Sequence, residues 1–370
     1  MSSSKFKSNK TSDPIELQSI AVNWKSPSNI ALIKYWGKHG RQFPSNPSVS
    51  FTLNKAHSTM ELKAHPKSNS SEKSIDLELY FEEERNIPFE DRVRHFLEEI
   101  TDIFPFLDQW KLQIYSSNSF PHSSGIASSA SSMSALALCL CELENKILGI
   151  DPKQDFLQKA SYVARQASGS ACRSVYGIAA LWGKTAALEK ATDEHAVSVE
   201  DIIHPVFKSF RDAILVVSDR PKSVSSSAGH SLMNDHIFSE KRFEVAESNL
   251  QAILSHLRDG NVPEFGKIVE SEALMLHAMM MTSNPSYLLF EPETVRLIHL
   301  IRNYREETGY SLFFTLDAGP NIHLLYPEAQ KDGIESFVKA ELLPHCVPGC
   351  SIFDECGPGP EKIQATGNSQ

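Results

Sequence analysis

Alternation of apolar and polar positions predicts the first strand of this chain. Val49, Phe51 and Leu53 alternate with the hydroxyl residues between them, which is typical of a strand with one buried face. Short continuous apolar runs predict three more strands, at 213–218, 311–316 and 321–326. The Asp, Gly and Pro residues within 317–320 predict a tight connection between the last two strands.

Helical spacing is clearest where Leu297, Leu300, Ile301 and Tyr304 follow the i, i+3, i+4, i+7 pattern of a helix with one buried face. Four more segments are predicted to be helices: 127–143, 155–167, 243–257 and 263–279. Strands mixed with helices, without strict alternation, predict an α+β fold. Residues 1–17 are predicted to be a disordered lead-in, and 64–73 a loop tip.

Composition places the chain among ordinary globular proteins. Its 370 residues, 41% of them hydrophobic, suffice for two domains or one large domain. The formal net charge of -10 argues against nucleic acid or an anionic membrane surface as the partner. No apolar run approaches the roughly 18 residues that span a bilayer, and the polar N-terminus lacks the apolar stretch of a signal peptide. The sequence therefore predicts a cytoplasmic protein.

The six cysteines lie among apolar or small residues and form no CxxC pair, so they are predicted to be buried free thiols. A zinc site was considered for His345, Cys346, Cys350 and Cys356. Their spacing fits no common zinc site.

Asp317 is the leading candidate for a catalytic residue. It follows an apolar, Phe-rich strand and opens a tight connection, so the backbone can hold its carboxylate at the rim of a cleft. The other interpretation is that the carboxylate only hydrogen-bonds its own turn, as Asp often does.

The segment 121–130 is a polar, Gly-containing loop that leads directly into the helix predicted at 127–143. Backbone N–H groups at a helix N-terminus, with Ser hydroxyls beside them, form a site for phosphate. No Gly-Lys-Ser or Gly-Lys-Thr closes the loop, so it is not a Walker loop. Simple N-capping by Ser is the other interpretation.

Two further segments bring cations among apolar or small residues. Lys34 and Lys38 flank Tyr35 and two other residues, and either face anionic groups or lie with their stems along the surface. Arg173 follows a run of small residues, so its guanidinium either binds a substrate anion or pairs with a structural carboxylate. A weaker Ser/Gly loop follows at 225–229.

Taken in order, these motifs resemble the diphosphomevalonate decarboxylase family of the GHMP kinase superfamily. The resemblance runs from about residue 20 to 360 and depends on five segments: 34–38, 121–130, 168–173, 225–226 and 317–321. The second segment is the signature of the superfamily, whereas the first, third and last are specific to the decarboxylase branch.

The resemblance implies a two-domain α+β fold of the GHMP kinase type. It combines an N-terminal domain like ribosomal protein S5 domain 2 with a ferredoxin-like C-terminal α/β sandwich, and the active site lies in the cleft between them. We expect a lead-in at 1–18, an N-terminal domain at 19–205 and a C-terminal domain at 206–370 that carries Asp317. A homodimer is expected.

The implied reaction converts ATP and (R)-5-diphosphomevalonate to isopentenyl diphosphate, carbon dioxide, ADP and phosphate, a step of the mevalonate pathway of isoprenoid biosynthesis. Relatives that take 5-phosphomevalonate, or that only phosphorylate the C3 hydroxyl of mevalonate, remain alternatives, as does an inactive nucleotide-binding regulator. By resemblance, the catalytic residues are Asp317, Lys34 and Arg173. The residues implied to bind substrate are Tyr35, Lys38, Ser168 and Ser170, together with Arg173. Those implied to bind ATP are Ser123, Ser124, Gly125, Ser128, Ser129, Ser225 and Ser226. Magnesium is expected to arrive with ATP, with Ser129 as a candidate ligand and no dedicated protein site.

Overall fold

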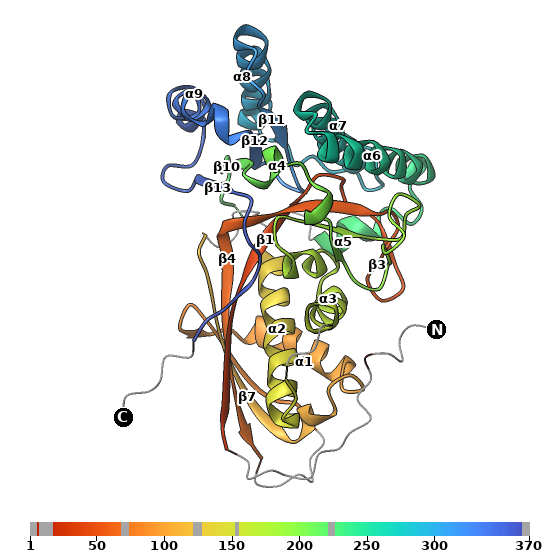
Figure 1. The fold of residues 1–370 in the computed structure, drawn as a ribbon, viewed down its shortest axis with the longest axis vertical. Coiled ribbons are helices and arrows are strands. Elements are labelled where there is room, and N and C mark those ends of the chain that lie inside the picture. Colours follow the sequence, from red (N-terminus) through yellow and green to blue (C-terminus); the bar gives the residue numbers. More distant parts are fainter. Residues whose placement is uncertain are drawn as a thin grey trace.

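The computed structural model describes residues 6, 18–67, 74–120, 128–151, 155–220 and 226–364. Its strands form two main sheets, which lie one above the other along the long axis of the molecule (Figure 1). The path of the first sheet is β14-β1-β4-β7-β5-β6, with β8 paired to β4 and β9 paired to β8. Its strands are β1 (Ile20–Ala31), β4 (Ser48–Pro66), β5 (Asp76–Phe81), β6 (Glu84–Arg85), β7 (Trp110–Asn118), β8 (Ala179–Trp182), β9 (Val197–Ser198) and β14 (Glu361–Lys362).

The second sheet has the order β11-β12-β10-β13, and all its neighbouring strands are antiparallel. Its strands are β10 (Arg211–Leu215), β11 (Phe313–Thr315), β12 (Ile322–Tyr326) and β13 (Ile352–Glu355). A small hairpin joins β2 (Lys38–His39) and β3 (Phe43–Pro44). Two sheets with packed helices confirm the predicted α+β class.

Helices cover both sheets, and two of those that accompany the second sheet also pack against the first. The first sheet packs against α1 (Ile87–Glu99), α2 (Ser128–Leu148) and α3 (Phe156–Ala167), while α6 (Ser239–Asp259), α7 (Val262–Met281), α8 (Pro292–Thr308) and α9 (Lys331–Phe337) accompany the second (Figure 1). Two short helices, α4 (Pro205–Lys208) and α5 (Ser226–Ser231), lie between these groups in the chain. All five helices and all four strands predicted from the sequence are present, with bounds that differ by a few residues.

The small residues of α2 explain why this helix can lie deep against the first sheet. Hydroxyl pairs join it to two strands, with Ser131 Oγ 2.7 Å from Ser58 Oγ and Ser134 Oγ 2.5 Å from Ser26 Oγ. These bonds satisfy hydroxyl groups that would otherwise be buried without partners. The contacts of Ser26 and Ser58 also place the N-terminal end of α2 beside the part of β1 that leads toward Lys34.

The prediction that Val49, Phe51 and Leu53 belong to a strand with only one buried face is wrong in one respect. Both faces of this part of β4 are buried, including Ser50 and Thr52. One face meets a cluster of Phe rings between the two sheets, where Phe51 and Phe265 of α7 have ring centroids 5.8 Å apart. On the other face, Thr52 Oγ1 donates to the carbonyl of Tyr176 at 2.7 Å. The alternation of apolar and hydroxyl residues therefore arises because the two faces of the strand pack against different parts of the interior. It does not mean that one face contacts solvent.

The predicted lead-in at 1–17 lies outside the described residues, apart from Phe6, whose ring packs 5.1 Å from that of Tyr162. Most of the predicted loop tip at 64–73 also lies outside them. The boundary placed at 205 stays a prediction, and the structure adds that β14 returns to pair with β1. None of the described helices is long and apolar enough to cross a membrane.

Asp354 joins the two sheets where β4 is irregular. Its buried carboxylate accepts three backbone N–H groups, from Asn54 at 3.0 Å, Lys55 at 2.8 Å and Ala56 at 2.7 Å. The pairing of β1 with β4 shifts register in the same region. The Asp354 carboxylate on β13 therefore accepts hydrogen bonds from N–H groups of β4 for which the neighbouring strand β1 supplies no acceptor.

Replacing Asp354 by Ala is expected to lower the free energy of unfolding by about 3 kcal/mol, because three backbone donors lose a buried charged acceptor. Urea denaturation measures this change. Asp332→Ala, at an exposed position of α9, is the matched control and should change stability by less than about 0.5 kcal/mol. Equal effects of the two substitutions would contradict a joining role for Asp354.

Candidate active site

Lys34 and Asp317 form an ion pair, although they lie 283 residues apart in the sequence. Lys34 Nζ donates to Asp317 Oδ1 at 2.8 Å; the lysine side chain is 1% exposed and the carboxylate 33% exposed. The turn after Asp317 has its own backbone bond, from the N–H of Gly319 to the carbonyl of Asp317 at 2.7 Å. The carboxylate thus combines a buried partner on one side with access to solvent on the other.

Burial lowers the pKa of Lys34, and the negative charges of Asp317 and Glu272 act in the opposite direction. The charge of Arg173 lowers this pKa further. The protonated state of Lys34 therefore depends on the carboxylates beside it.

Arg173 lies in the 3₁₀ segment Gly169–Val175 and is fully buried. Its Nη1 donates to Ser48 Oγ at 2.9 Å, and its Nε and Nη2 donate to Asn29 Oδ1 at 3.3 and 3.2 Å. No carboxylate pairs with it among the residues that the structure describes. Burial lowers the pKa of Arg173. A buried guanidinium bonded only to neutral oxygens favours an anion beside it.

Tyr35 presents a buried hydroxyl that has no hydrogen-bond partner within the described part of the chain. Its ring lies between Trp182 and His230, with centroids 4.8 and 4.4 Å away. Gly169 is required here, since a Cβ at that position would lie 2.7 Å from the Tyr35 hydroxyl oxygen. Ser168 and Ser170 flank this glycine, so the structure brings these three polar residues of the prediction together.

Lys38 is half-exposed in β2 and donates to Gln42 Oε1 at 3.1 Å. Burial lowers its pKa, and the charge of Arg92 on α1 lowers it further. Two cations therefore approach each other, and no carboxylate partner of either is present in the described ranges. Arg92 was not predicted, because the sequence of α1 carries charges throughout and does not single it out.

The predicted ATP-binding residues are only partly described. Ser123, Ser124, Gly125 and Ser225 lie outside the described residues. Ser128 and Ser129 open α2, and the Ser128 carbonyl accepts the hydroxyls of Ser131 and Ser132 at 3.2 and 2.7 Å. Ser226 opens α5.

Helix α5 lies beside the segment that carries Lys34 and Lys38. The Nδ1 atom of its residue His230 accepts the N–H of Gly37 at 3.0 Å, and the ring centroid lies 4.7 Å from that of Trp36. The C-terminal end of α5 therefore packs against the segment that follows Lys34.

Asn29, Ser48 and Glu272 were also missed as site residues. Asn29 stands in the buried end of β1 and links Arg173 to Ser174, donating to Ser174 Oγ at 2.8 Å. Asn29 could have been predicted, because it is a polar residue inside an apolar strand. Nothing in the sequence indicated Glu272, because acidic residues are common on helices.

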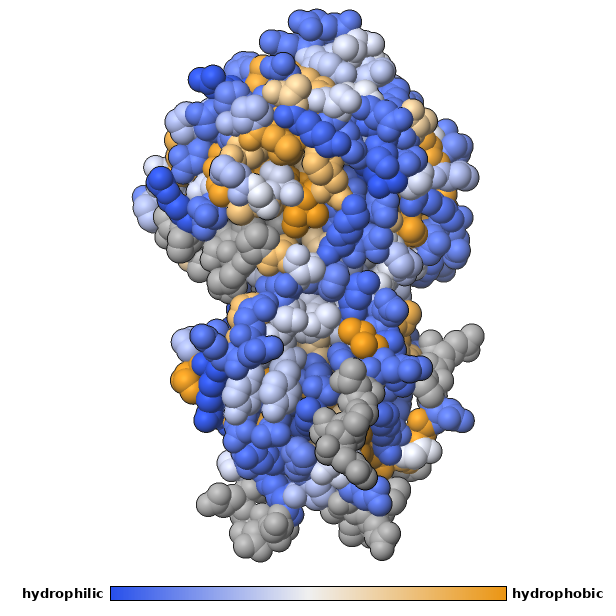
Figure 2. Space-filling view, turned by 90° about the vertical axis from the view of Figure 1, so that its left-hand side faces the viewer, coloured by the Kyte–Doolittle hydropathy of each residue, from blue (hydrophilic) through white to orange (hydrophobic). Residues whose placement is uncertain are grey.

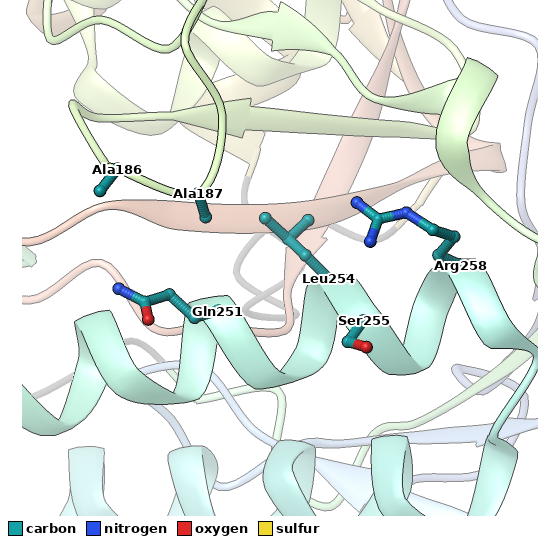
Figure 3. A pocket seen from close by; sticks show the side chains of 6 residues that line it. All are labelled: Ala186, Ala187, Gln251, Leu254, Ser255 and Arg258. Carbon is teal, nitrogen blue, oxygen red and sulfur yellow. The ribbon is translucent and has the colours of Figure 1, made fainter.

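A surface groove of about 290 Å³ lies between α6 and the segment 186–187 (Figure 3). It contains none of the predicted site residues and is lined by Ala186, Ala187, Gln251, Leu254, Ser255 and Arg258. All six cysteines are free, and the described residues include no group of three His, Cys, Asp or Glu side chains suited to a metal ion.

Two family models match this chain. Residues 26–195 match a diphosphomevalonate decarboxylase-like N-terminal domain, and residues 213–355 match a mevalonate 5-diphosphate decarboxylase C-terminal domain. A diphosphomevalonate decarboxylase from Eremothecium gossypii is 30% identical over 85% of this chain and 80% of its own length. The chain belongs to the diphosphomevalonate decarboxylase family.

Solved structures of diphosphomevalonate decarboxylases share the fold. The enzyme from Staphylococcus aureus aligns with a TM-score of 0.79 and 25% identity, over 94% of this chain and 99% of the other. A protein called MDDEF, solved in complex with MVAPP, AMPPCP and magnesium, aligns with a TM-score of 0.77 and 24% identity, over 94% of this chain and 100% of the other. The predicted GHMP kinase-like, two-domain fold is confirmed.

The buried imidazole of His230 predicts how the stability of this protein depends on pH. Burial lowers the pKa of His230 from 6.5 to about 3, so between these values the unfolded chain binds a proton that the folded chain does not. Stability is therefore lost as the pH falls below 6.5, by about 1 kcal/mol between pH 7.5 and 5.5 from this group alone.

His230→Asn keeps an acceptor for the Gly37 N–H but does not titrate in this range. Urea denaturation at both pH values should give a smaller pH-dependent loss for the variant than for the wild type, by about 1 kcal/mol. The other histidines are common to both proteins and cancel in this difference. Equal losses would show that His230 is not held neutral by burial.

Proposed function

We propose that this chain catalyses the ATP-dependent decarboxylation of (R)-5-diphosphomevalonate to isopentenyl diphosphate, with release of carbon dioxide, ADP and phosphate. The observation that carries the proposal is the ion pair of the buried Lys34 with Asp317 near Arg173, a buried cation that forms no ion pair with a described carboxylate. Membership of the diphosphomevalonate decarboxylase family supports the same reaction class.

The chemistry explains why a carboxylate and two buried cations are needed. The tertiary C3 hydroxyl of the substrate is a poor leaving group, so it first attacks the γ-phosphorus of ATP, and ADP departs. The C3–O bond then breaks to release phosphate, and the electrons of the C–CO2 bond form the new double bond. Asp317 orients or deprotonates the hydroxyl, and its exposed side gives substrate access to it.

Lys34 and Arg173 provide the positive charge that these steps require. Lys34 Nζ, held against Asp317, neutralises charge on the transferring phosphoryl group and on the departing phosphate. Arg173 binds the substrate carboxylate with its guanidinium, which Asn29 and Ser48 hold in a fixed orientation. Because both cations are buried, their charges act in a region of low effective dielectric constant.

The diphosphate of the substrate binds beside these groups. We assign it to Tyr35, Lys38, Ser168 and Ser170, and add Arg92 because its charge faces Lys38. The unpartnered hydroxyl of Tyr35 and the unpaired cations of Lys38 and Arg92 fit an anion with several acceptor oxygens.

ATP binds at the start of α2 and near the start of α5. Ser123, Ser124, Gly125, Ser128 and Ser129 hold its phosphates, and Ser225 or Ser226 orients the γ-phosphate. The described start of α2 fits this role, since the opening of a 21-residue helix supplies free N–H groups and a favourable dipole.

Magnesium would accompany ATP and supply positive charge to its phosphate groups. Ser129 is the candidate protein ligand. We also propose a homodimer and a cytoplasmic location.

Asp317→Asn is expected to lower kcat by about a thousandfold or more with little change in substrate affinity, because the amide cannot accept the proton or match the charge of Lys34. Release of carbon dioxide and ADP measures turnover, and isothermal titration measures substrate binding. Asp332→Asn, at an exposed position of α9, is the control and should keep full activity. A fully active Asp317→Asn would contradict the assigned role.

Mevalonate, 5-phosphomevalonate and 5-diphosphomevalonate should be compared as substrates in one assay. The proposal predicts equal amounts of carbon dioxide and ADP with the diphosphate, and little of either with the other two. ADP without carbon dioxide would identify a kinase, and preferential turnover of the monophosphate would identify a 5-phosphomevalonate decarboxylase. No turnover with any of the three would indicate an inactive nucleotide-binding protein.

A further inference from the structure

We propose that helix α7 positions both members of the Lys34–Asp317 pair, through Glu272 on the lysine side and His277 on the aspartate side. Glu272 and His277 are positioning residues that act through the backbone of the two catalytic residues. The catalytic consequence rests on the proposed function, but the geometry and the charge of Glu272 can be tested without it.

Glu272 is completely buried, and its carboxylate accepts the backbone N–H of Lys34 at 2.9 Å. Arg242 of α6 donates to both carboxylate oxygens, at 3.2 Å to Oε1 and 2.5 Å to Oε2, and Asn249 donates to Oε1 at 2.7 Å. The carboxylate is therefore fixed from α6 by three bonds while a fourth reaches the backbone of Lys34. An ion pair that served only to join α6 and α7 would not need the fourth bond.

His277 holds the other side of the pair. It is 1% exposed, and its Nε2 donates to the carbonyl oxygen of Asp317 at 3.1 Å. The imidazole stacks on Phe290 with ring centroids 4.1 Å apart and an interplanar angle of 18°. The stacking holds the imidazole ring in place. The hydrogen bond from this ring to the Asp317 carbonyl therefore fixes the position of the backbone at the start of the connection after β11.

One helix therefore sets the separation of two residues that come from different sheets. Lys34 follows a strand of the first sheet, and Asp317 follows β11 of the second. Phosphoryl transfer depends on position, and a shift of about 1 Å in a reacting group can cost about a hundredfold in rate. α7 provides the common reference because Glu272 and His277 lie five residues apart on it.

Glu272 also contributes charge. The charged groups around Lys34 are Asp317, Glu272, Arg173 and Asp212, and the negative charge of Glu272 supports the protonated ammonium. Loss of this charge therefore lowers the pKa of Lys34. If catalysis needs protonated Lys34, activity at alkaline pH must then decline from a lower pH than in the wild type.

The decisive comparison is Glu272→Gln against Glu270→Gln. Glu270 lies on the same helix in a less buried ion pair, 2.6 Å from Arg305, and accepts the N–H of Phe314 at 3.3 Å, but bonds neither Lys34 nor Asp317. Both variants are expected to be less stable in urea. Only Glu272→Gln is expected to lower kcat, by about 10- to 100-fold, with KM for diphosphomevalonate within about threefold and the alkaline limb of kcat displaced to lower pH.

The His277 side is tested with two variants that separate its two contacts. His277→Phe keeps the stack on Phe290 and loses the donor, whereas His277→Gln keeps a donor and loses the stack. The proposal predicts a lower kcat for His277→Phe and a smaller loss for His277→Gln. Equal activities, or the reverse order, would exclude the bond to Asp317 as the cause.

A measurement without substrate keeps this test independent of the proposed reaction. NMR of ε-¹³C-lysine-labelled protein follows the titration of Lys34, assigned by the signal lost in Lys34→Met. The Lys34 pKa should fall by about one unit in Glu272→Gln and stay unchanged in Glu270→Gln. If wild-type protein turned over no mevalonate derivative, the proposed function would fail while this titration still decided the role of Glu272. Identical kcat and identical Lys34 titration in the two variants would overturn the inference.

Discussion

The burial of the Lys34 ammonium is the constraint on which the site depends. An isolated ammonium in the interior costs several kcal/mol, and a carboxylate partner offsets that cost only when the geometry is good. Here the partner comes from the other sheet, so the ion pair exists only when both sheets are in place. The folded arrangement of the whole molecule is therefore a condition for charge at the reacting centre.

The burial of Arg173 imposes a similar electrostatic cost. A second buried cation near the first adds to the electrostatic cost of the site, since the pKa of Lys34 is lowered by the charge of Arg173. Neutral oxygens of Asn29 and Ser48 satisfy its hydrogen bonds without neutralising it. An anionic substrate would offset this positive charge, so its binding would stabilise the folded protein.

Sequence reasoning found the groups that lie in short, local patterns. Lys34, Arg173 and Asp317 each stand in a segment whose neighbours are apolar, small or turn-forming, and the structure brings all three together. Glu272, His277 and Arg92 were not predicted as site residues. Each lies inside a helix, and its role depends on a contact with residues distant in the sequence, which the local sequence pattern does not indicate. The half-buried strand at Val49–Phe51–Leu53 failed for a related reason: alternation shows that two faces differ, but it does not show what covers them.

The two parts of the molecule meet at a waist, visible on the face in Figure 2, and the chain crosses this waist more than once. After the second sheet is complete, β14 returns to the first and pairs Trp24 with Lys362 and Lys25 with Glu361. During synthesis, one edge of β1 therefore stays without its native partner until residues 361–362 have left the ribosome. An uncovered edge presents free N–H and C=O groups that can pair with other chains. The protein thus protects this edge with a segment that is made more than 300 residues after β1, so the edge stays open to such pairing until that segment has returned.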